Sequence, residues 1–295
     1  DEGDYSVVVS NANGSVLAGP TRVRMIREAL FNISTRGYVG VGDEIMIAGF
    51  VVSGKQSRRV LIRGLGKSLE LRGVSGALAD PNIALHDVSG TKIEENDDWV
   101  ESTNSQEIEK LTPKVGAIAL EDQTESAMLV TLSPGLYTVH LSGAGGSSGI
   151  GLVEVFDASD ESIETRLVNI STRVLSSTGD RVAIGGFVIT GQDPKRVLVR
   201  ALGPELENRG ISEYMPNPKI TLYEASEAVA RNDDWGDESV FQLQEAFSQA
   251  GASALPIDSE DAAMIRELQP GLYTVVVSDF GGEDGIALIE IFELP

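Results

Sequence analysis

The sequence predicts an all-β fold: two homologous antiparallel β-sandwich or jelly-roll-like domains, each with one short helix. Short apolar runs that alternate or are bounded by Gly-rich turns occur throughout the chain, as in antiparallel β proteins. The chain of 295 residues suits about two domains. An internal duplication, with a period too long for a solenoid repeat, divides it into two such units.

The duplication is visible in four motifs. Segment 59–63 (RVLIR) recurs as 196–200 (RVLVR), an offset of 200 − 63 = 137. The later motif NDDW at 96–99 recurs at 232–235, an offset of 232 − 96 = 136. The other two pairs are LFNISTR with LVNISTR, and PGLYTV with itself. We therefore expect repeat 1 at 20–157, repeat 2 at 158–295, and a loop near Ser89 and Gly90, where one residue is lost.

Strand and helix patterns predict the elements of each repeat. Segments 44–52 and 60–63 flank a Ser-Gly turn, which predicts a hairpin. Segments 136–141 and 150–156 flank a Gly-rich turn, which predicts a second hairpin. Segment 239–247 begins with a capping Ser and lacks Gly and Pro, so it predicts a helix, with a counterpart near 105–111.

Composition excludes several classes of partner. The chain has 45 acidic and 23 basic residues, a net charge of −22, which disfavours nucleic acids and anionic membrane surfaces. It has no cysteine, which excludes disulfides, thiol nucleophiles and Cys-ligated metals. No apolar run approaches the ~20 residues of a membrane span, so we expect no membrane insertion.

The segment 1–19 lies outside the repeat. Asp1, Gly3 and Tyr5 form an Asp-x-Gly-x-Tyr pattern that resembles the tyrosine corner of immunoglobulin-like domains. The segment is similar to the last two strands of such a domain, whose remainder is absent. It therefore predicts either a truncated fragment or a free strand. A strand with Tyr5, Val7, Val8 and Val9 and no partner would need a sheet to join.

Both repeats resemble a known bacterial module. The motifs NISTR, GFVI, RVLVRALGP, NDDW and PGLYTV are similar to a tandem β-sandwich module of very large secreted proteins of environmental bacteria, often found after immunoglobulin-like domains. The second half of each repeat also resembles pre-peptidase C-terminal domains, β-sandwiches appended to secreted enzymes, some of which bind calcium or polymeric substrates. The resemblance implies an extracellular or cell-surface location and no catalytic residue.

Acidic motifs shared by both repeats are the strongest candidates for a site. Calcium prefers six to eight oxygen ligands, which loops of this composition supply. The candidate ligands are Asn96, Asp97, Asp98, Asp122, Asn232, Asp233, Asp234 and Asp258. A structural alternative is that each Asn-Asp-Asp run forms capping turns without metal, with the following Trp as a packing anchor. No EF-hand spacing is present, and we expect no cofactor other than this candidate calcium.

Other polar residues favour simpler interpretations. His86 and His140 correspond to Tyr223 and Val276, so we expect two separate strand residues rather than a shared site. Segment 20–75 holds 10 of the 23 basic residues. It predicts either solvated strand faces or, less simply, a basic surface for head-to-tail contacts.

These observations favour a non-enzymatic extracellular structural protein, a subunit of a surface fibre, sheath or adhesive stalk. In the hypothesised mechanism the segment from Tyr5 to Val9 adds to a sheet of the next subunit and builds a head-to-tail homopolymer. That mechanism fails if the strand pairs within its own chain. One alternative is a polysaccharide- or protein-binding accessory module of a secreted hydrolase, with Tyr38, Trp99, Tyr214 and Trp235 as candidate contacts. The other is a passive spacer.

Overall fold

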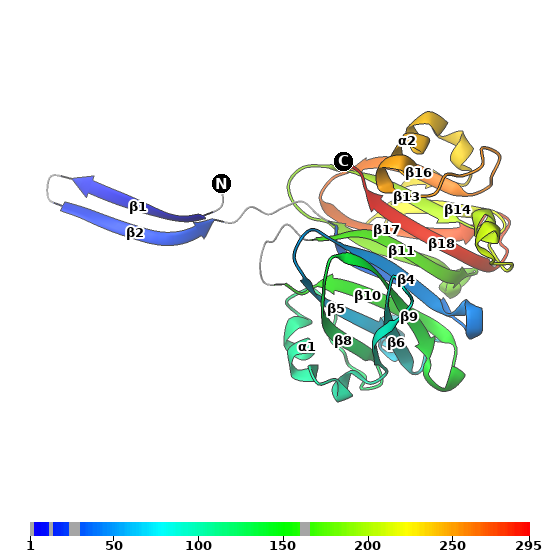
Figure 1. Ribbon diagram of the computed structural model, residues 1–295, viewed down its shortest axis with the longest axis horizontal. Helices are drawn as coiled ribbons and strands as arrows, with labels where there is room; N and C mark the ends of the chain where they lie inside the picture. Colours follow the sequence, from blue (N-terminus) through cyan, green and yellow to red (C-terminus); the bar gives the residue numbers. More distant parts are fainter. Residues whose placement is uncertain (1–2, 12–13, 24–29, 160–165) are drawn as a thin grey trace.

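The fold is almost entirely antiparallel β-sheet, as the sequence predicts. The computed structural model describes residues 3–11, 14–23, 30–159 and 166–295. Sixteen strands of the described chain form the body, and two more form a separate sheet (Figure 1). Two α-helices accompany them, α1 (Ser105–Leu111) and α2 (Val240–Ala250), and they confirm the predicted helices. Neither described helix has the length and apolar character of a membrane span.

The body consists of two strand layers that pack face to face. The first layer, in spatial order, contains β8 (Ser126–Leu132), β5 (Arg58–Leu65), β10 (Gly149–Asp157), β3 (Leu30–Val39), β12 (Ala183–Ile189), β17 (Gly271–Asp279), β14 (Pro218–Glu224) and β15 (Glu227–Asn232). The second contains β16 (Ala262–Leu268), β13 (Lys195–Leu202), β18 (Gly285–Glu293), β11 (Arg166–Ser176), β4 (Met46–Ser53), β9 (Gly135–Gly143), β6 (Pro81–Asp87) and β7 (Lys92–Asn96). Each repeat contributes four strands to each layer.

The two repeats join edge to edge in both layers. In the first layer β3 pairs with β12, and in the second β11 pairs with β4. The hydroxyls of Thr35 and Thr172 lie 2.9 Å apart at this junction, are buried, and are separated by the repeat offset of 137. Since each repeat contacts the other through equivalent strands, the junction has the reciprocal geometry of a two-fold interface.

One hydrophobic core runs through both repeats. It includes Val60 and Val153 from the first layer and Val139 from the second, all in repeat 1. The same cluster continues into repeat 2 through Val199 and Val275. The predicted units 20–157 and 158–295 are therefore the two halves of one sandwich rather than domains with separate cores. The turn between β6 and β7, which holds Ser89 and Gly90, is the expected site of the lost residue.

Both predicted hairpins of the repeats are wrong. β4 pairs with β9 and β11, whereas β5 pairs with β8 and β10 in the opposite layer. β9 and β10 are likewise in opposite layers. The short turns therefore carry the chain across the sandwich instead of back along the same sheet. β4 alternates buried and half-buried residues, but β5 is buried almost throughout because other segments cover its outer face as well.

Buried satellite clusters lie outside the main sandwich, beneath the helices. In repeat 2, Leu243 and Phe247 of α2 pack with Trp235 and Leu198. In repeat 1, Ile108 of α1 packs with a corresponding cluster around Leu61 and Leu129. Figure 1 shows α1 and α2 at opposite ends of the body. Short 3-10 turns complete the described chain: η1 (Gly42–Glu44), η2 (Lys67–Arg72), η3 (Trp99–Glu101), η4 (Ala144–Gly146), η5 (Gly179–Arg181), η6 (Pro204–Arg209) and η7 (Trp235–Asp237).

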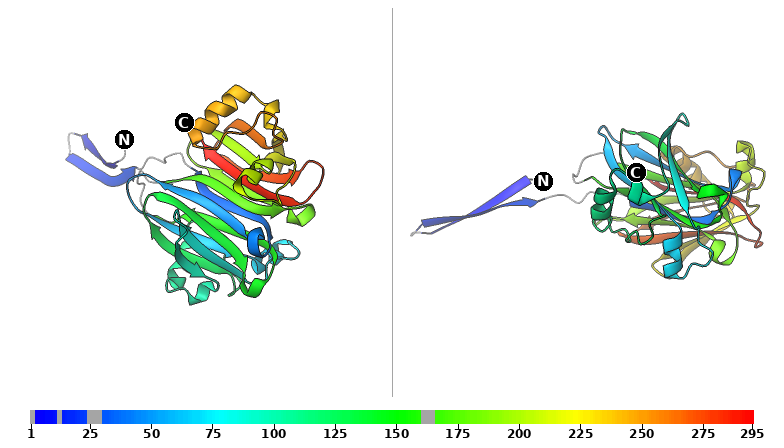
Figure 2. Two further views of the ribbon diagram at one scale, coloured as in Figure 1. Left: turned by 45° about the vertical axis from the view of Figure 1, so that its right-hand side comes forward. Right: turned by 90° about the horizontal axis from the view of Figure 1, so that it is seen from below.

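The N-terminal segment is a hairpin, not an unpaired strand. β1 (Gly3–Asn11) pairs antiparallel with β2 (Gly14–Val23), for example Val8 with Leu17. The segment therefore contains two paired strands. This pairing contradicts the single free strand, and β2 extends four residues past the predicted boundary at 19. Figures 1 and 2 show the hairpin projecting from the body.

Candidate functional site

Each repeat buries one arginine–glutamate ion pair that the sequence reasoning missed. Arg63 Nε lies 3.3 Å from Glu154, and Arg200 Nε lies 3.4 Å from Glu290. Both arginine side chains have no exposed surface. Burial raises the pKa of Glu154 and of Glu290, while the facing guanidinium lowers it. The same offsets that relate the motifs relate these residues, so each pair belongs to the fold of the repeat.

A second buried carboxylate in each repeat holds the loop before a 3-10 turn. Glu125 accepts the backbone N–H groups of Gly66 and Ser68, at 2.7 and 2.6 Å. Its counterpart, Asp261, accepts those of Gly203 and Glu205. A Cβ atom on Gly66 would collide with the carbonyl oxygen of Leu78, so this position requires glycine. These shared acidic residues are thus structural acceptors.

The repeated Asn-Asp-Asp-Trp motif forms a backbone clamp. Asn96 accepts the Ala127 N–H through its side-chain oxygen at 2.8 Å and donates to the Asp98 carbonyl at 3.0 Å. Asn232 makes the same two bonds, with Ala263 and Asp234.

The tryptophan that follows each motif is anchored through two N–H groups. The Trp99 indole donates to the Asp122 carbonyl, and its backbone N–H donates to the Glu125 carbonyl. Trp235 donates equivalently to the carbonyls of Pro256 and Asp261. The anchored tryptophans agree with the structural alternative, but neither Asp98 nor Asp234 makes the side-chain capping bond that it expected.

The structure brings some of the calcium candidates together. Burial raises the pKa of Asp80, and the charges of Asp98, Asp97 and Asp122 raise it further, so four carboxylates of repeat 1 share one field. In repeat 2, burial raises the pKa of Asp234, and Asp233 and Asp237 add to it. Asp80 is replaced there by Asn217.

The side-chain oxygens of three of these candidates have other partners. The side-chain oxygens of Asn96 and Asn232 accept backbone N–H groups. The Asp122 carboxylate accepts the backbone N–H of Thr124 and lies 3.2 Å from Lys67 Nζ. Asp258 is exposed at the surface. Within the described residues, no group of three or more His, Asp or Glu side chains has an arrangement that could hold a metal ion. Calcium binding by these loops stays a prediction.

The two histidines, expected to be separate, lie together on the outer face of the second layer. The rings of His86, on β6, and His140, on β9, have centroids 4.2 Å apart. Burial lowers the pKa of His140, and the nearby His86 and Arg173 lower it further through their charge. His86 is paired with Thr138, so the two histidines are diagonal neighbours on adjacent strands. The sequence alone does not reveal that β6 and β9 are adjacent.

This lowered pKa predicts a pH dependence of stability. The unfolded chain takes up a proton near the ordinary histidine pKa of about 6.5, at which the folded His140 still resists protonation. We therefore expect the free energy of unfolding to fall as the pH falls from about 7 to about 5. The variant His140→Val, which has the residue of repeat 2, should flatten this dependence in urea denaturation. An unchanged slope in His140→Val would assign the pH dependence to other groups.

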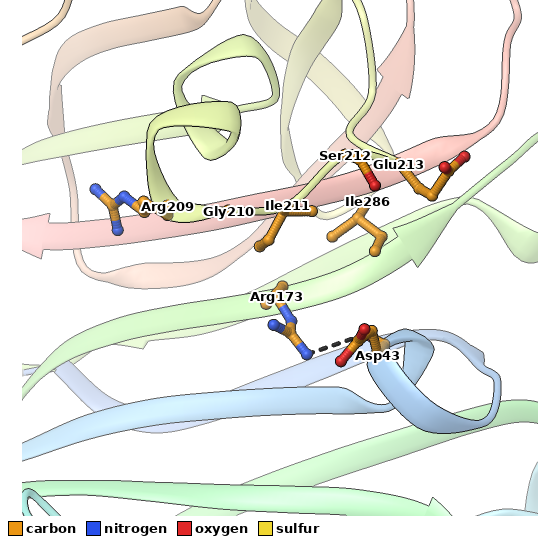
Figure 3. Close-up of a pocket in the computed structure, with 8 residues that line it drawn as sticks. All are labelled: Asp43, Arg173, Arg209, Gly210, Ile211, Ser212, Glu213 and Ile286. Atoms are coloured by element: carbon orange, nitrogen blue, oxygen red, sulfur yellow. Dashed lines mark hydrogen bonds between the residues drawn. The ribbon is translucent and has the colours of Figure 1, made fainter.

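A polar groove lies at the junction of the repeats (Figure 3). Its volume is about 290 Å³, and Arg173 and Asp43 lie on one wall while the loop from Arg209 to Glu213 forms the other. The Arg173 guanidinium donates to the Asp43 carbonyl at 3.0 Å. Ser212 is the one hydroxyl side chain in the lining, which contains no histidine. The lining therefore combines acidic and basic side chains, and it places no histidine beside the Ser212 hydroxyl.

The equivalent groove on the other side of the junction is also open, with a volume of about 500 Å³, although its lining residues contact one another. Ser75 donates to Asp180 at 2.8 Å, and the Arg181 guanidinium lies 4.5 Å from the Tyr38 ring centroid. Asp180 corresponds to Asp43 by the offset of 137. The two grooves therefore arise from the reciprocal geometry of the junction, and they differ in the side chains that line them.

Several of the described basic residues of segment 20–75 pair within their own repeat, whereas the side chains of Arg22, Arg24 and Arg27 lie outside the described part of the chain. Arg58 lies 3.3 Å from Asp157, Arg59 contacts Glu107, and Lys67 contacts Asp122. These internal pairs favour the simpler interpretation of that segment over an intermolecular basic surface.

The aromatic candidates have different environments. Trp235 is fully buried and cannot contact a polymer, which corrects its place among the candidates. Trp99 is half-buried. Tyr38 donates to Ser148, and Tyr214 donates to Glu207. The structure therefore does not align the four aromatics on one exposed face.

The assembly strand is described through its backbone. Tyr5, Val7, Val8 and Val9 lie on β1, paired to β2 on one side. The hairpin is a two-stranded sheet that shares no strand pairing with the described strands of the body. Donation of a single unpaired strand is therefore wrong as a mechanism, because β1 already has a partner in its own chain.

Comparisons with known proteins assign no family. No family model matches the chain, and no curated protein matches it. A solved structure of PNGF-II is similar over 92% of this chain and 58% of that one, with 10% identity and a TM-score of 0.21. A DUF4785 family protein from Legionella pneumophila subsp. pneumophila is similar over 98% of this chain and 83% of that one, with 5% identity and a TM-score of 0.25. At these TM-scores neither likeness carries an argument.

Proposed function

We propose that this chain is a non-enzymatic extracellular module of a bacterial surface fibre, sheath or adhesive stalk, and that it assembles head to tail through the edge of its N-terminal hairpin. The supporting observation is the separation of β1 and β2 from the sixteen-stranded body. An isolated two-stranded hairpin is marginally stable in water, and a third strand is needed for independent stability. A neighbouring molecule can supply that strand through main-chain hydrogen bonds.

The two edges of the hairpin differ, which favours β1 as the contact. The pairing register shifts between Tyr5 and Val7, opposite Gly19 and Pro20 of β2. Gly19 has a φ of 118°, and proline has no N–H to donate, so the outer edge of β2 is interrupted. β1 contains no proline. Its outer N–H and C=O groups therefore form the continuous edge that accepts another strand.

Light scattering after size exclusion tests this proposal. The intact chain should form species that grow with concentration, and a chain lacking residues 1–23 should remain a monomer. A dimer at twice the 31.3 kDa of one chain would indicate closed pairing of β1 with β1 and contradict an open fibre. Monomers in both samples would contradict the proposal and favour the binding-module or spacer alternatives.

Proline variants locate the contact within the hairpin. Consecutive N–H groups of a strand point to opposite edges, so one of Val8→Pro and Val9→Pro removes an outward donor of β1. That variant should abolish association while the hairpin persists. The matched controls are Leu17→Pro and Val16→Pro, at the paired positions of β2. Loss of association in the β2 control alone would contradict the assignment to β1.

A further inference from the structure

A pocket lies beside Trp99 in repeat 1. Its volume is about 330 Å³, and it lies between α1 and the following loop. The lining is largely apolar, with Trp99, Pro113, Ala117 and Leu120, and Glu109 is the one ionisable group in it. Trp99 itself is half-buried. The pocket is therefore a surface cavity with an aromatic wall.

In repeat 2 the same place is filled by the ring of Phe247. Ala252 N–H donates to the Phe247 carbonyl at 2.9 Å, and in repeat 1 Ala117 N–H donates to the Thr112 carbonyl at 3.0 Å. Both pairs are related by 252 − 117 = 247 − 112 = 135, so Thr112 occupies the backbone position of Phe247. The Phe247 ring is buried, with its centroid 5.8 Å from that of Trp235. Replacing this ring by threonine leaves the pocket open in repeat 1.

The residues that hold the Phe247 ring are retained in repeat 1. The Arg200 guanidinium lies 4.5 Å from the Phe247 ring centroid and donates to the Ser253 carbonyl. Arg63 makes the equivalent bond, to the Ile118 carbonyl at 2.7 Å. Within the described residues, Nη2 of Arg63 has no hydrogen-bond partner, whereas Nη2 of Arg200 bonds the Ser253 hydroxyl. Repeat 1 thus keeps the tryptophan and the arginine but lacks the ring.

We infer that the pocket beside Trp99 binds a phenyl ring from outside the chain, in the position that Phe247 fills in repeat 2. Aromatic rings gain from contact with tryptophan beyond simple burial, and Trp99 lines this pocket. The size is sufficient, because an apolar cavity of about 150 Å³ already binds benzene. This site is independent of the hairpin edge.

Titration of the intact chain with benzyl alcohol, followed by NMR, tests the inference. We expect a saturable shift of the Trp99 indole N–H, with the Trp235 indole unchanged. The variant Thr112→Phe should fill the pocket and weaken binding at least tenfold. The matched control Thr112→Ser should bind within about twofold of the natural chain, because it adds no volume. Phe247→Thr should open a second site, so that the Trp235 indole also shifts.

Several outcomes would overturn the inference. One is the absence of a saturable shift, and another is a shift that persists in a folded Thr112→Phe variant. If that variant does not fold, Ala117→Leu reduces the same cavity from the loop side and must weaken binding instead. Methyl glucoside provides the chemical contrast: binding of this sugar without binding of benzyl alcohol would assign the pocket to sugars and contradict a phenyl site.

Discussion

Replacement of Arg200 by methionine is expected to lower the free energy of unfolding by about 3–5 kcal/mol at neutral pH. The change leaves Glu290 buried without its cation, and it removes the bonds to Ser253. It also removes the guanidinium from the face of Phe247. Urea denaturation monitored by circular dichroism measures the loss. The unpaired carboxylate, rather than lost packing, should dominate, because the methionine side chain retains much of the apolar volume.

A double variant separates charge from packing. Arg200→Met combined with Glu290→Leu removes both members of the pair, and replacing a whole buried pair by apolar residues is often neutral or stabilising. We expect it to recover most of the stability lost in the single variant. If the double variant is as unstable as Arg200→Met, the buried charge is not the cause, and the hydrogen bonds to Ser253 carry the effect.

Replacement of Trp235 by alanine is expected to cost about 3–5 kcal/mol. Trp235 has no exposed surface, contacts Phe247, and donates to the Pro256 carbonyl at 2.8 Å. Its removal opens a cavity inside the cluster beneath α2 and leaves that carbonyl without its donor. Thermal unfolding and urea denaturation of the variant measure the loss.

Trp99→Ala is the matched variant in repeat 1. Trp99 occupies the same motif and makes the same kind of indole bond, but one of its sides already borders the open pocket. We expect its replacement to cost at least about 1 kcal/mol less than that of Trp235, because fewer contacts are lost. Equal losses would contradict the conclusion that the two repeats differ in packing at this place.

The sequence supports the fold class and the repeat because both depend on local patterns. Alternating apolar runs and turn residues predict antiparallel strands, and the offsets of 137 and 136 align equivalent strands of the two halves. The helix at α2 and the lost residue between β6 and β7 follow from capping and turn residues. None of these predictions depends on which strands are neighbours.

Strand pairing could not be predicted in the same way. The turns after β4 and β9 look like hairpin turns, yet each takes the chain to the opposite layer. Turn residues specify a change of direction, but they do not specify which layer the next strand joins. The pairing of β3 with β12, and of β11 with β4, links residues more than a hundred positions apart. A local pattern contains no information on such pairs.

The candidate site was predicted only in part. The recurrence of Asn-Asp-Asp-Trp indicated a shared feature, but the sequence did not predict the backbone clamp that Asn96 and Asn232 form. The Arg63–Glu154 pair was missed, although its recurrence as Arg200–Glu290 on predicted strands was a visible sign of a buried pair. The neighbouring histidines and the pocket beside Trp99 depend on sheet order and on helix packing, which the sequence does not reveal.

Amide hydrogen exchange of the intact chain, at low and high protein concentration, tests the proposed assembly most directly. We predict that exchange in peptides covering β1 slows as the concentration rises, because the outer N–H groups of that edge become hydrogen-bonded. The exchange rates of peptides that cover β2 should change little, because its outer N–H groups stay exposed to water. Exchange in β1 that is independent of concentration, or protection that appears only in the body, would contradict association through the hairpin edge.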